Sequence, residues 1–182
     1  MTLDATHKFN SELTAERLFG WHAALFPTGR SNRRSIAVAT WRDASAGPMQ
    51  VVSGERGRER VHYEAPAAAK LDSEMGTFIE WHNGDLQIDP IIKAAVAHLW
   101  FVSIHPFEDG NGRIGRAISE MTLARSEGTP LRAYSMSAEM YAERQAYYEE
   151  LEAAQKGDLN ISSWLLWFLS CLNRAMARKG TP

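Results

Sequence analysis

The residue types that could do chemistry are concentrated in one stretch of the chain, from His105 to Arg116. This stretch combines an imidazole, two carboxylates, three glycines and two arginines, a mixture that few structural tasks require. Gly110 and Gly112 allow the backbone to turn tightly and to approach a ligand closely. The first N–H groups of a following helix would point outward with partial positive charge. The stretch therefore predicts a loop that binds an anion at the start of a helix.

The charged side chains of this stretch predict how such an anion is held. Arg113 and Arg116 are three residues apart, which makes them neighbours on one helix face, where their guanidinium groups could bind phosphate oxygens. Asp109 could hold a Mg²⁺ ion that bridges those phosphates, or it could cap the helix. His105 is the group of this stretch that is suited to removing a proton near neutral pH.

Two common nucleotide-binding motifs do not account for the stretch. The glycines at 110, 112 and 115 have the spacing of the dinucleotide-binding fingerprint. That fingerprint needs a preceding strand, whereas residues 89–104 have helical spacing. The phosphate loop of ordinary nucleotide hydrolases is also excluded, because no Gly-x4-Gly-Lys-Ser/Thr string occurs.

The remaining patterns predict an all-α fold with one β-hairpin inserted before the core helices. Apolar spacing predicts a first helix between Thr14 and Pro27, and β-forming residues with glycines predict the hairpin within residues 35–63. Residues 1–12 are polar and unpatterned, which predicts a loose N-terminal tail. The later helices are predicted to begin after Pro66, at Asp89-Pro90, near Gly112, at a Ser137 cap and near Ile161.

Composition and charge exclude several classes of protein. The chain has 182 residues, of which 45% are apolar and 23% charged, as is typical of one globular domain. A net charge of −2 without basic runs argues against binding to nucleic acid or to an anionic membrane. The sequence shows neither a bilayer-spanning stretch nor a secretory signal, which predicts a cytoplasmic protein. Cys171 is the single cysteine, so intrachain disulfides are excluded.

The stretch from His105 to Arg116 resembles the signature of the Fic-domain family, His-x-Phe-x-(Asp/Glu)-Gly-Asn-Gly-Arg-x-x-Arg, and matches it at every defined position. Fic enzymes of this pattern mostly transfer AMP from ATP to a hydroxyl group of a target protein and release pyrophosphate. The resemblance implies a single Fic catalytic domain at residues 13–177, with an active-site loop at 105–112 and a flap near 49–63. It also implies ATP as co-substrate, Mg²⁺ as cofactor and a target protein as partner.

The resemblance implies a role for each matching residue. His105 would be the general base that takes the proton from a Ser, Thr or Tyr hydroxyl of the target. Phe107 would pack inward and fix the loop, and Asp109 would hold Mg²⁺. The phosphates of ATP would be bound by Gly110, Asn111, Gly112, Arg113 and, at the γ-phosphate, Arg116.

Two further regions follow from the same resemblance. The residues at the family's adenine pocket are Tyr147, Tyr148, Leu151 and Gln155. The residues of the flap, which in the family pairs with target backbone by strand addition, are Val51, Val52, Val61, His62 and Tyr63. Backbone pairing of this kind positions a hydroxyl group without reading much of the surrounding sequence.

One departure from the family pattern concerns an inhibitory helix, Ser/Thr-x3-Glu-Gly/Asn, whose Glu pairs with the second arginine of the signature. Ser135-x3-Glu139 is the one similar string, and it fails because Met140 follows. The inhibitory segment is then on a missing part of the protein, on an antitoxin-like partner, or absent. The abrupt start of the chain favours a missing N-terminal segment, and we expect the chain as it stands not to be self-inhibited.

Other functions remain open from the sequence. They are transfer of another nucleotide or phosphate-containing group, removal of AMP by water, and a non-catalytic module that senses a nucleotide. The histidines outside the signature are expected to be structural; they are His7, His22, His62, His82 and His98.

Overall fold

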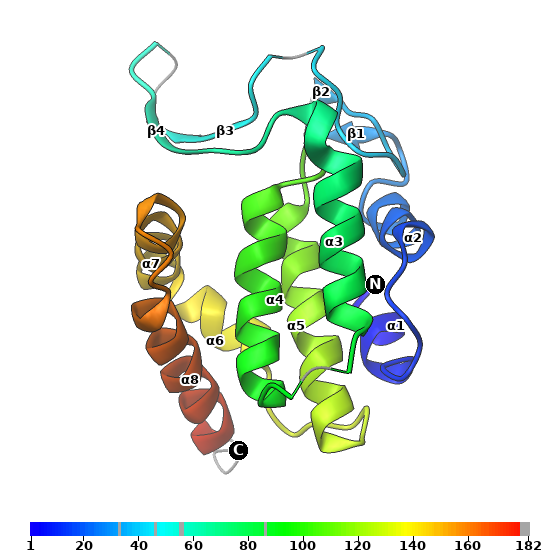
Figure 1. Cartoon of the computed structure of the whole chain (residues 1–182), viewed down its shortest axis with the longest axis vertical. Helices are drawn as coiled ribbons and strands as arrows, with labels where there is room; N and C mark the ends of the chain where they lie inside the picture. Colours follow the sequence, from blue (N-terminus) through cyan, green and yellow to red (C-terminus); the bar gives the residue numbers. More distant parts are fainter. Residues whose placement is uncertain (33, 46, 55–56, 86, 179–182) are drawn as a thin grey trace. The chain divides into compact units, whose positions relative to one another are not determined.

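The computed structural model of the chain describes residues 1–32, 34–45, 47–54, 57–85 and 87–178. This part of the chain is mostly helical, and its strands form two short hairpins (Figure 1). The helices are α1 (Thr2–His7), α2 (Ala15–Leu25), η1 (Ala68–Lys70), α3 (Leu71–Asn83), α4 (Pro90–Ile104), α5 (Asn111–Glu127), α6 (Met136–Ala142), α7 (Arg144–Lys156) and α8 (Ser162–Ala177). The strands are β1 (Arg30–Ser31), β2 (Arg34–Ser35), β3 (Gln50–Ser53) and β4 (Arg60–Glu64). The predicted all-α fold with a hairpin before the core helices is confirmed.

Two helix starts, those of α2 and α4, follow from local capping chemistry. Thr14 caps α2, because its side chain accepts a hydrogen bond from the Arg17 N–H at 3.2 Å. Asp89 accepts hydrogen bonds from the N–H groups of Ile91 and Ile92 at the start of α4. Both helix starts agree with the prediction from sequence.

The described residues fall into two compact units. The first contains Ser11–Gln87 and Trp100–Gly115, and the second contains Thr2–Asn10, Ile88–Leu99 and the residues from Arg116 onward. Helices α4 and α5 therefore contribute residues to both units. The predicted active-site loop, residues 105–112, lies within the first unit.

Phe78 on α3 lies in the core of the first unit. Its side chain is fully buried. Its ring centroid is 6.3 Å from that of Trp81, 5.6 Å from that of Trp100 and 5.8 Å from that of Phe101. Because Trp100 and Phe101 belong to the C-terminal part of α4, this packing fixes the end of α4 from which the predicted active-site loop starts.

The β1–β2 hairpin was not predicted from the sequence. It pairs Arg30 with Ser35 and Ser31 with Arg34. Asn32, in its turn, has a φ of 51°, a left-handed conformation that asparagine tolerates better than most residues. This hairpin and the segment that follows it both contact the active-site loop.

The β3–β4 hairpin corresponds to the predicted flap. Its antiparallel register places Val51 opposite Tyr63 and Val52 opposite Val61, with an irregularity between Val51 and Val52 that leaves His62 as an extra residue. Figure 1 shows the hairpin extending away from the N-terminal end of α3. Residues 55 and 56, at the turn of the predicted flap, lie outside the described residues.

His98 on α4 is buried in the second unit. Its Nδ1 is 3.1 Å from the Ser119 hydroxyl, and its Nε2 is 2.9 Å from the Tyr147 hydroxyl. Its ring stacks on Trp164, whose indole N–H donates to the Ala95 carbonyl at 2.9 Å. These contacts join α4, α5, α7 and α8 around one imidazole.

The single cysteine, Cys171, is buried on α8. Burial raises the pKa of its thiol to about 12, and the Glu143 carboxylate acts in the same direction. The thiol is therefore protonated at neutral pH.

The predicted loose tail at residues 1–12 is wrong in part, because Thr2–His7 form α1 with Ala5 buried. A helix this short, with one buried alanine, has too few apolar positions to show a period. The Arg125 guanidinium donates to the Phe9 carbonyl at 2.9 Å, which holds the segment after α1 against α5.

The helix predicted from a Ser137 cap is in fact two helices. Ser135 is the N-cap of α6, because its hydroxyl accepts a backbone N–H three residues later at 3.1 Å. Ser137 lies inside α6, where its hydroxyl bonds to the Glu120 carboxylate. The chain leaves the helical conformation at Glu143, whose carboxylate pairs with Arg174. No glycine or proline marks this break in the sequence.

Removal of the Phe78 ring should destabilise the fold. Phe78→Ala leaves a cavity between aromatic rings, and losses of this kind cost about 3–5 kcal/mol in free energy of unfolding. Urea denaturation followed by tryptophan fluorescence measures the loss. Thr77→Ala, at an exposed position of the same helix, is the control and should change stability by less than about 0.5 kcal/mol. Equal losses in both variants would contradict a core role for Phe78.

Candidate active site

The active-site loop connects α4 to α5. The N–H of His105 donates to the Phe101 carbonyl at 3.1 Å, and the φ of His105 is 52°, so the chain turns out of the helix at this residue. Gly110 has a φ of 87°, and α5 begins at the next residue, Asn111. The loop therefore leads directly into a helix N-terminus, as the sequence predicts.

Asn111 closes this loop with two hydrogen bonds to one residue. Its Oδ1 accepts from the Phe107 N–H at 2.9 Å, and its Nδ2 donates to the Phe107 carbonyl at 2.8 Å. Asn111 is 2% exposed. The Asn111 side chain thus positions the loop, and the predicted binding of phosphate by Asn111 stays a prediction. Its backbone N–H, in the first turn of α5, is the group suited to bind an anion.

Phe107 packs inward, as expected from the sequence. It is fully buried. Its ring is nearly parallel to that of His22, with centroids 4.1 Å apart, and its centroid is 5.0 Å from that of Trp41. Phe107 therefore fastens the middle of the loop into the hydrophobic core.

His22 on α2 also holds the loop through hydrogen bonds. The Ala39 N–H donates to Nδ1 of His22 at 3.2 Å, so Nδ1 carries no proton. The Nε2–H then donates to the Asp109 carbonyl at 3.2 Å. Burial lowers the pKa of His22, and a neutral ring is the form that fits both hydrogen bonds. The structural role expected for His22 thus includes support of the active-site loop.

Arg42 binds the other end of the loop. It is 5% exposed, and its Nε donates to the His105 carbonyl at 2.8 Å. Its backbone N–H donates to the Pro106 carbonyl at 2.9 Å, and a terminal nitrogen donates to the Pro66 carbonyl at 2.6 Å. The sequence does not mark Arg42 or His22, because they are 63 and 87 positions away from the loop residues to which they bond.

The His105 ring is oriented by its own helix. Its Nδ1 is 3.2 Å from the Val102 carbonyl, which can only accept, so Nδ1 carries the proton and Nε2 has a lone pair. Burial lowers the pKa of His105 from its ordinary value of 6.5; the hydrogen bond to Val102 opposes this shift and the Arg42 charge reinforces it. The ring is therefore neutral at physiological pH and can accept a proton at Nε2.

The Asp109 carboxylate has two neighbours that donate to it. Its Oδ2 accepts from the Ser31 hydroxyl, and its Oδ1 accepts from the Gly110 N–H. The Arg113 guanidinium is 3.7 Å from Oδ1. The side chain of Asp109 is 44% exposed and faces a hollow of about 390 Å³. The residues that line the hollow are Ser31, Asn32, Arg34, Ile36, Glu108 and Asp109.

The oxygen atoms at this hollow fit a hard divalent cation such as Mg²⁺. Asp109 provides an accessible carboxylate, and Ser31 and Asn32 provide further oxygens. Within the described ranges, no group of three or more His, Cys, Asp or Glu side chains is arranged to hold a metal ion. Mg²⁺ needs few protein ligands, because it keeps several waters and is often held together with substrate phosphates. Asp109 is thus suited to a Mg²⁺ ion that arrives with a nucleotide.

Phe26 shapes the surface next to the start of α5. The Arg113 side chain is 43% exposed, and its guanidinium carbon lies 4.8 Å from the centroid of the Phe26 ring. A Cβ atom on Gly110 would lie only 3.0 Å from the same ring. A glycine is therefore needed for the backbone to pass this close to Phe26, and the ring keeps Arg113 near the loop.

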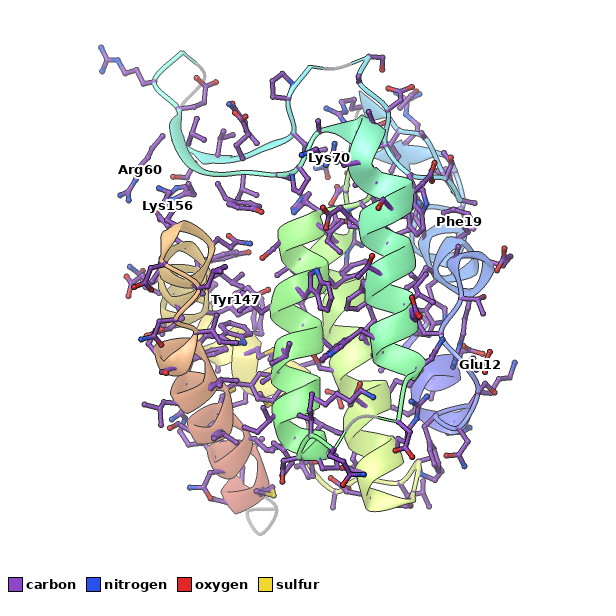
Figure 2. All side chains as sticks on the ribbon, viewed as in Figure 1. Glu12, Phe19, Arg60, Lys70, Tyr147 and Lys156 are labelled. Atoms are coloured by element: carbon purple, nitrogen blue, oxygen red, sulfur yellow. The ribbon has the colours of Figure 1, made fainter. Side chains whose placement is uncertain are left out.

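Arg116 and the four predicted adenine-pocket residues belong to the second unit. Tyr147 is buried on α7, and Figure 2 shows its side chain projecting from α7 toward α4, where its hydroxyl meets His98. Burial raises the pKa of the Tyr147 hydroxyl. Tyr148 is 62% exposed, Leu151 is buried and Gln155 is half-buried. Tyr147 thus packs in the core, and the adenine pocket remains a prediction.

The flap residues divide into an exposed pair and a half-buried set. The exposed pair is Val52 and Val61, and the half-buried residues are Val51, His62 and Tyr63. The Tyr63 hydroxyl donates to the Ser103 carbonyl at 2.9 Å. The hairpin is therefore fastened to the part of α4 that ends next to His105.

The helical fold and the loop between α4 and α5 define a Fic-type protein. A solved structure of a Fic family protein from Desulfovibrio desulfuricans superposes with a TM-score of 0.74 at 21% identity, covering 97% of this chain and 50% of that one. The Fic/DOC family matches residues 12–123, and the chain belongs to this family.

Relatives named protein adenylyltransferase match parts of the chain. The protein fic-1 of Caenorhabditis elegans is 39% identical over 88 residues, which cover 47% of this chain and 16% of that protein. The Fic protein of Culex quinquefasciatus is 30% identical over 131 residues, which cover 69% of this chain and 25% of that protein. The matched regions thus cover a quarter or less of the length of these two relatives.

Gly110→Ala should damage the loop by more than the cost of its backbone conformation. The new Cβ would come within 3.0 Å of Phe26 and 3.3 Å of Leu25, in addition to the strain of a φ of 87°. Gly128, with a φ of 65°, has no described atom within 4 Å of a Cβ, so Gly128→Ala measures the backbone cost alone, about 1–2 kcal/mol. We expect Gly110→Ala to lose at least about 1 kcal/mol more in urea denaturation. Equal losses would contradict the close approach.

Proposed function

We propose that this chain transfers AMP from ATP to a Ser, Thr or Tyr hydroxyl of a target protein and releases pyrophosphate. The observation that carries the proposal is the orientation of His105. Its Nδ1 is engaged by the Val102 carbonyl, which leaves Nε2 as the proton acceptor at one end of a loop whose other end is a helix N-terminus. Membership of the Fic/DOC family and relatives named protein adenylyltransferase support the same activity.

The chemical step needs one base and one displaced group. The oxygen of the target hydroxyl attacks the α-phosphorus of ATP while its proton passes to Nε2 of His105. The bond from the α-phosphorus to the oxygen bridging to the β-phosphate breaks, and pyrophosphate leaves with the bonding electrons. Because burial lowers the pKa of His105, the base is in its neutral form before the reaction.

The loop and the start of α5 would bind the triphosphate. The backbone N–H groups of Asn111 and Gly112 lie in the first turn of α5, where they have no partner within the helix. Arg113 would bind the β-phosphate side and Arg116, on the same helix, the γ-phosphate. Mg²⁺ bound with the nucleotide would neutralise phosphate charge, and Asp109 would hold it.

The remaining assignments belong to the same proposal. We assign the catalytic domain to residues 13–177 and infer that the target adds a strand to the β3–β4 hairpin, which the Tyr63 hydroxyl holds to α4. Tyr148, Leu151 and Gln155 would contact the adenine. These residues lie outside the signature and would determine which nucleobase is accepted. The choice of ATP as the nucleotide donor is therefore part of the proposal.

The proposal extends to the inhibitory helix, which we expect this chain to lack. Glu139, in the one string that resembles an inhibitory helix, is 2% exposed and pairs with Arg174 and Arg178. This pairing supports the proposal that Ser135-x3-Glu139 is not an inhibitory helix. An inhibitory segment would then be on a missing part of the protein, on an antitoxin-like partner, or absent.

The cellular setting is also a prediction. We propose a cytoplasmic protein whose macromolecular partners are proteins, without nucleic acid or membrane binding. Among the described residues, no helix has both the length and the apolar character needed to cross a membrane.

His105→Ala should abolish transfer and leave nucleotide binding nearly intact. A general base contributes about 10²–10⁴-fold to the rate and acts in the transition state, so the affinity for a non-hydrolysable ATP analogue should stay within about threefold. Incorporation of AMP into target proteins is measured by mass spectrometry, which also identifies a different transferred group by its mass. His7→Ala, at an exposed histidine of α1, is the control. Transfer at the unchanged rate in His105→Ala would refute the base assignment.

Transfer should rise with pH and then level off. Below its pKa, His105 is protonated and cannot accept the proton of the target hydroxyl. Because burial lowers this pKa, the midpoint of the rise should lie below 6.5, with a plateau at neutral pH. Initial rates of AMP incorporation from radiolabelled ATP, measured between about pH 5 and 8, give the midpoint. A midpoint above the ordinary value for histidine would contradict the assignment.

A further inference from the structure

Ser31 is the side chain from outside the loop that donates to the Asp109 carboxylate. Its hydroxyl bonds to Oδ2 of Asp109 across a sequence separation of 78 residues. Ser31 also lines the hollow of about 390 Å³ next to this carboxylate. The family signature does not extend to residue 31, so the signature itself gives this serine no role.

The loop residue before Asp109 holds the hairpin on which Ser31 lies. One oxygen of Glu108 accepts from the Arg34 guanidinium at 2.6 Å, and the other accepts from the Ala37 N–H at 3.1 Å. Arg34 is the direct partner of Ser31 in the β1–β2 pairing. Glu108 occupies a position of the signature that has no defined residue type, and its contacts keep Ser31 next to Asp109.

A free Asp109 side chain would have a competing partner. The Arg113 guanidinium is 3.7 Å from Oδ1 of Asp109, and both side chains are more than 40% exposed. A carboxylate that turned to form a closer pair with Arg113 would move toward a side chain that does not line the hollow. The Ser31 hydroxyl occupies one lone pair of Oδ2 and thereby opposes this rotation, while a second lone pair on that oxygen stays available.

We propose that Ser31 is a positioning residue that orients the Asp109 carboxylate for Mg²⁺. This inference rests on the proposed function, in which Asp109 holds the Mg²⁺ that accompanies ATP. Hydrogen-bond partners of metal-binding carboxylates fix the orientation of the ligand, and loss of such a partner typically weakens metal binding about 10–100-fold.

The test separates the contribution of the metal from binding of the nucleotide. The Kd of a non-hydrolysable ATP analogue is measured by calorimetry in excess Mg²⁺ and in EDTA, and the ratio of the two values reports what Mg²⁺ contributes. In Ser31→Ala, Mg²⁺ should contribute about tenfold less than in the unchanged chain, with the Kd in EDTA unchanged. Ser31→Thr keeps the hydroxyl and should restore the ratio. Ser35→Ala, at an exposed serine of the facing strand, should leave both values unchanged.

The outcomes distinguish this inference from the proposal on which it rests. If Asp109→Ala retains the full contribution of Mg²⁺, Asp109 is not the metal ligand and that part of the proposed function fails. If Asp109→Ala loses the contribution and Ser31→Ala keeps it, the role of Ser31 alone is overturned. Equal weakening in Mg²⁺ and in EDTA for Ser31→Ala would show general damage to the loop and would also overturn the positioning role.

Discussion

The active-site loop depends on the pair of hydrogen bonds between the Asn111 amide and the backbone of Phe107. Both bonds are buried, and both use one side chain to satisfy the N–H and the carbonyl of a single residue. Loss of this amide would leave two buried backbone groups unsatisfied, which costs more than the bonds themselves contribute. This closure brings the end of α4, next to which His105 lies, close to the N-terminus of α5.

A second set of contacts surrounds this closure and comes from the N-terminal part of the chain. His22 and Arg42 bond to backbone carbonyls of the loop, and Ser31 bonds to its carboxylate. In the proposed function, their effect would be to keep donors and charges in position before a nucleotide arrives, which is how preorganised sites stabilise a transition state. Transfer of a phosphorus group depends largely on such positioning, because the protein supplies little covalent chemistry.

The sequence predicted those features whose signals lie a few residues apart. The caps at Thr14 and Asp89 depend on neighbouring residues, and the loop was recognisable because its glycines, imidazole and charges are contiguous. The interruption at Glu143 carries no such signal, because neither a glycine nor a proline is there and the partner of its carboxylate, Arg174, is distant in sequence. The contacts of Asn111 were missed for a similar reason: residue type shows that an amide is present, whereas only tertiary structure shows that it bonds to the backbone of Phe107. His22 was expected to be structural, but only the tertiary structure shows that it supports the active-site loop.

The chemistry of Cys171 has a practical consequence. A buried thiol with a pKa raised to about 12 has almost no thiolate at neutral pH, and the thiolate is the form that reacts with maleimides and iodoacetamides. A cysteine introduced at Ser53, on the exposed flap, would therefore be the one site on this chain that such reagents label. Fluorophores or spin labels could then report flap motion without prior removal of the native cysteine.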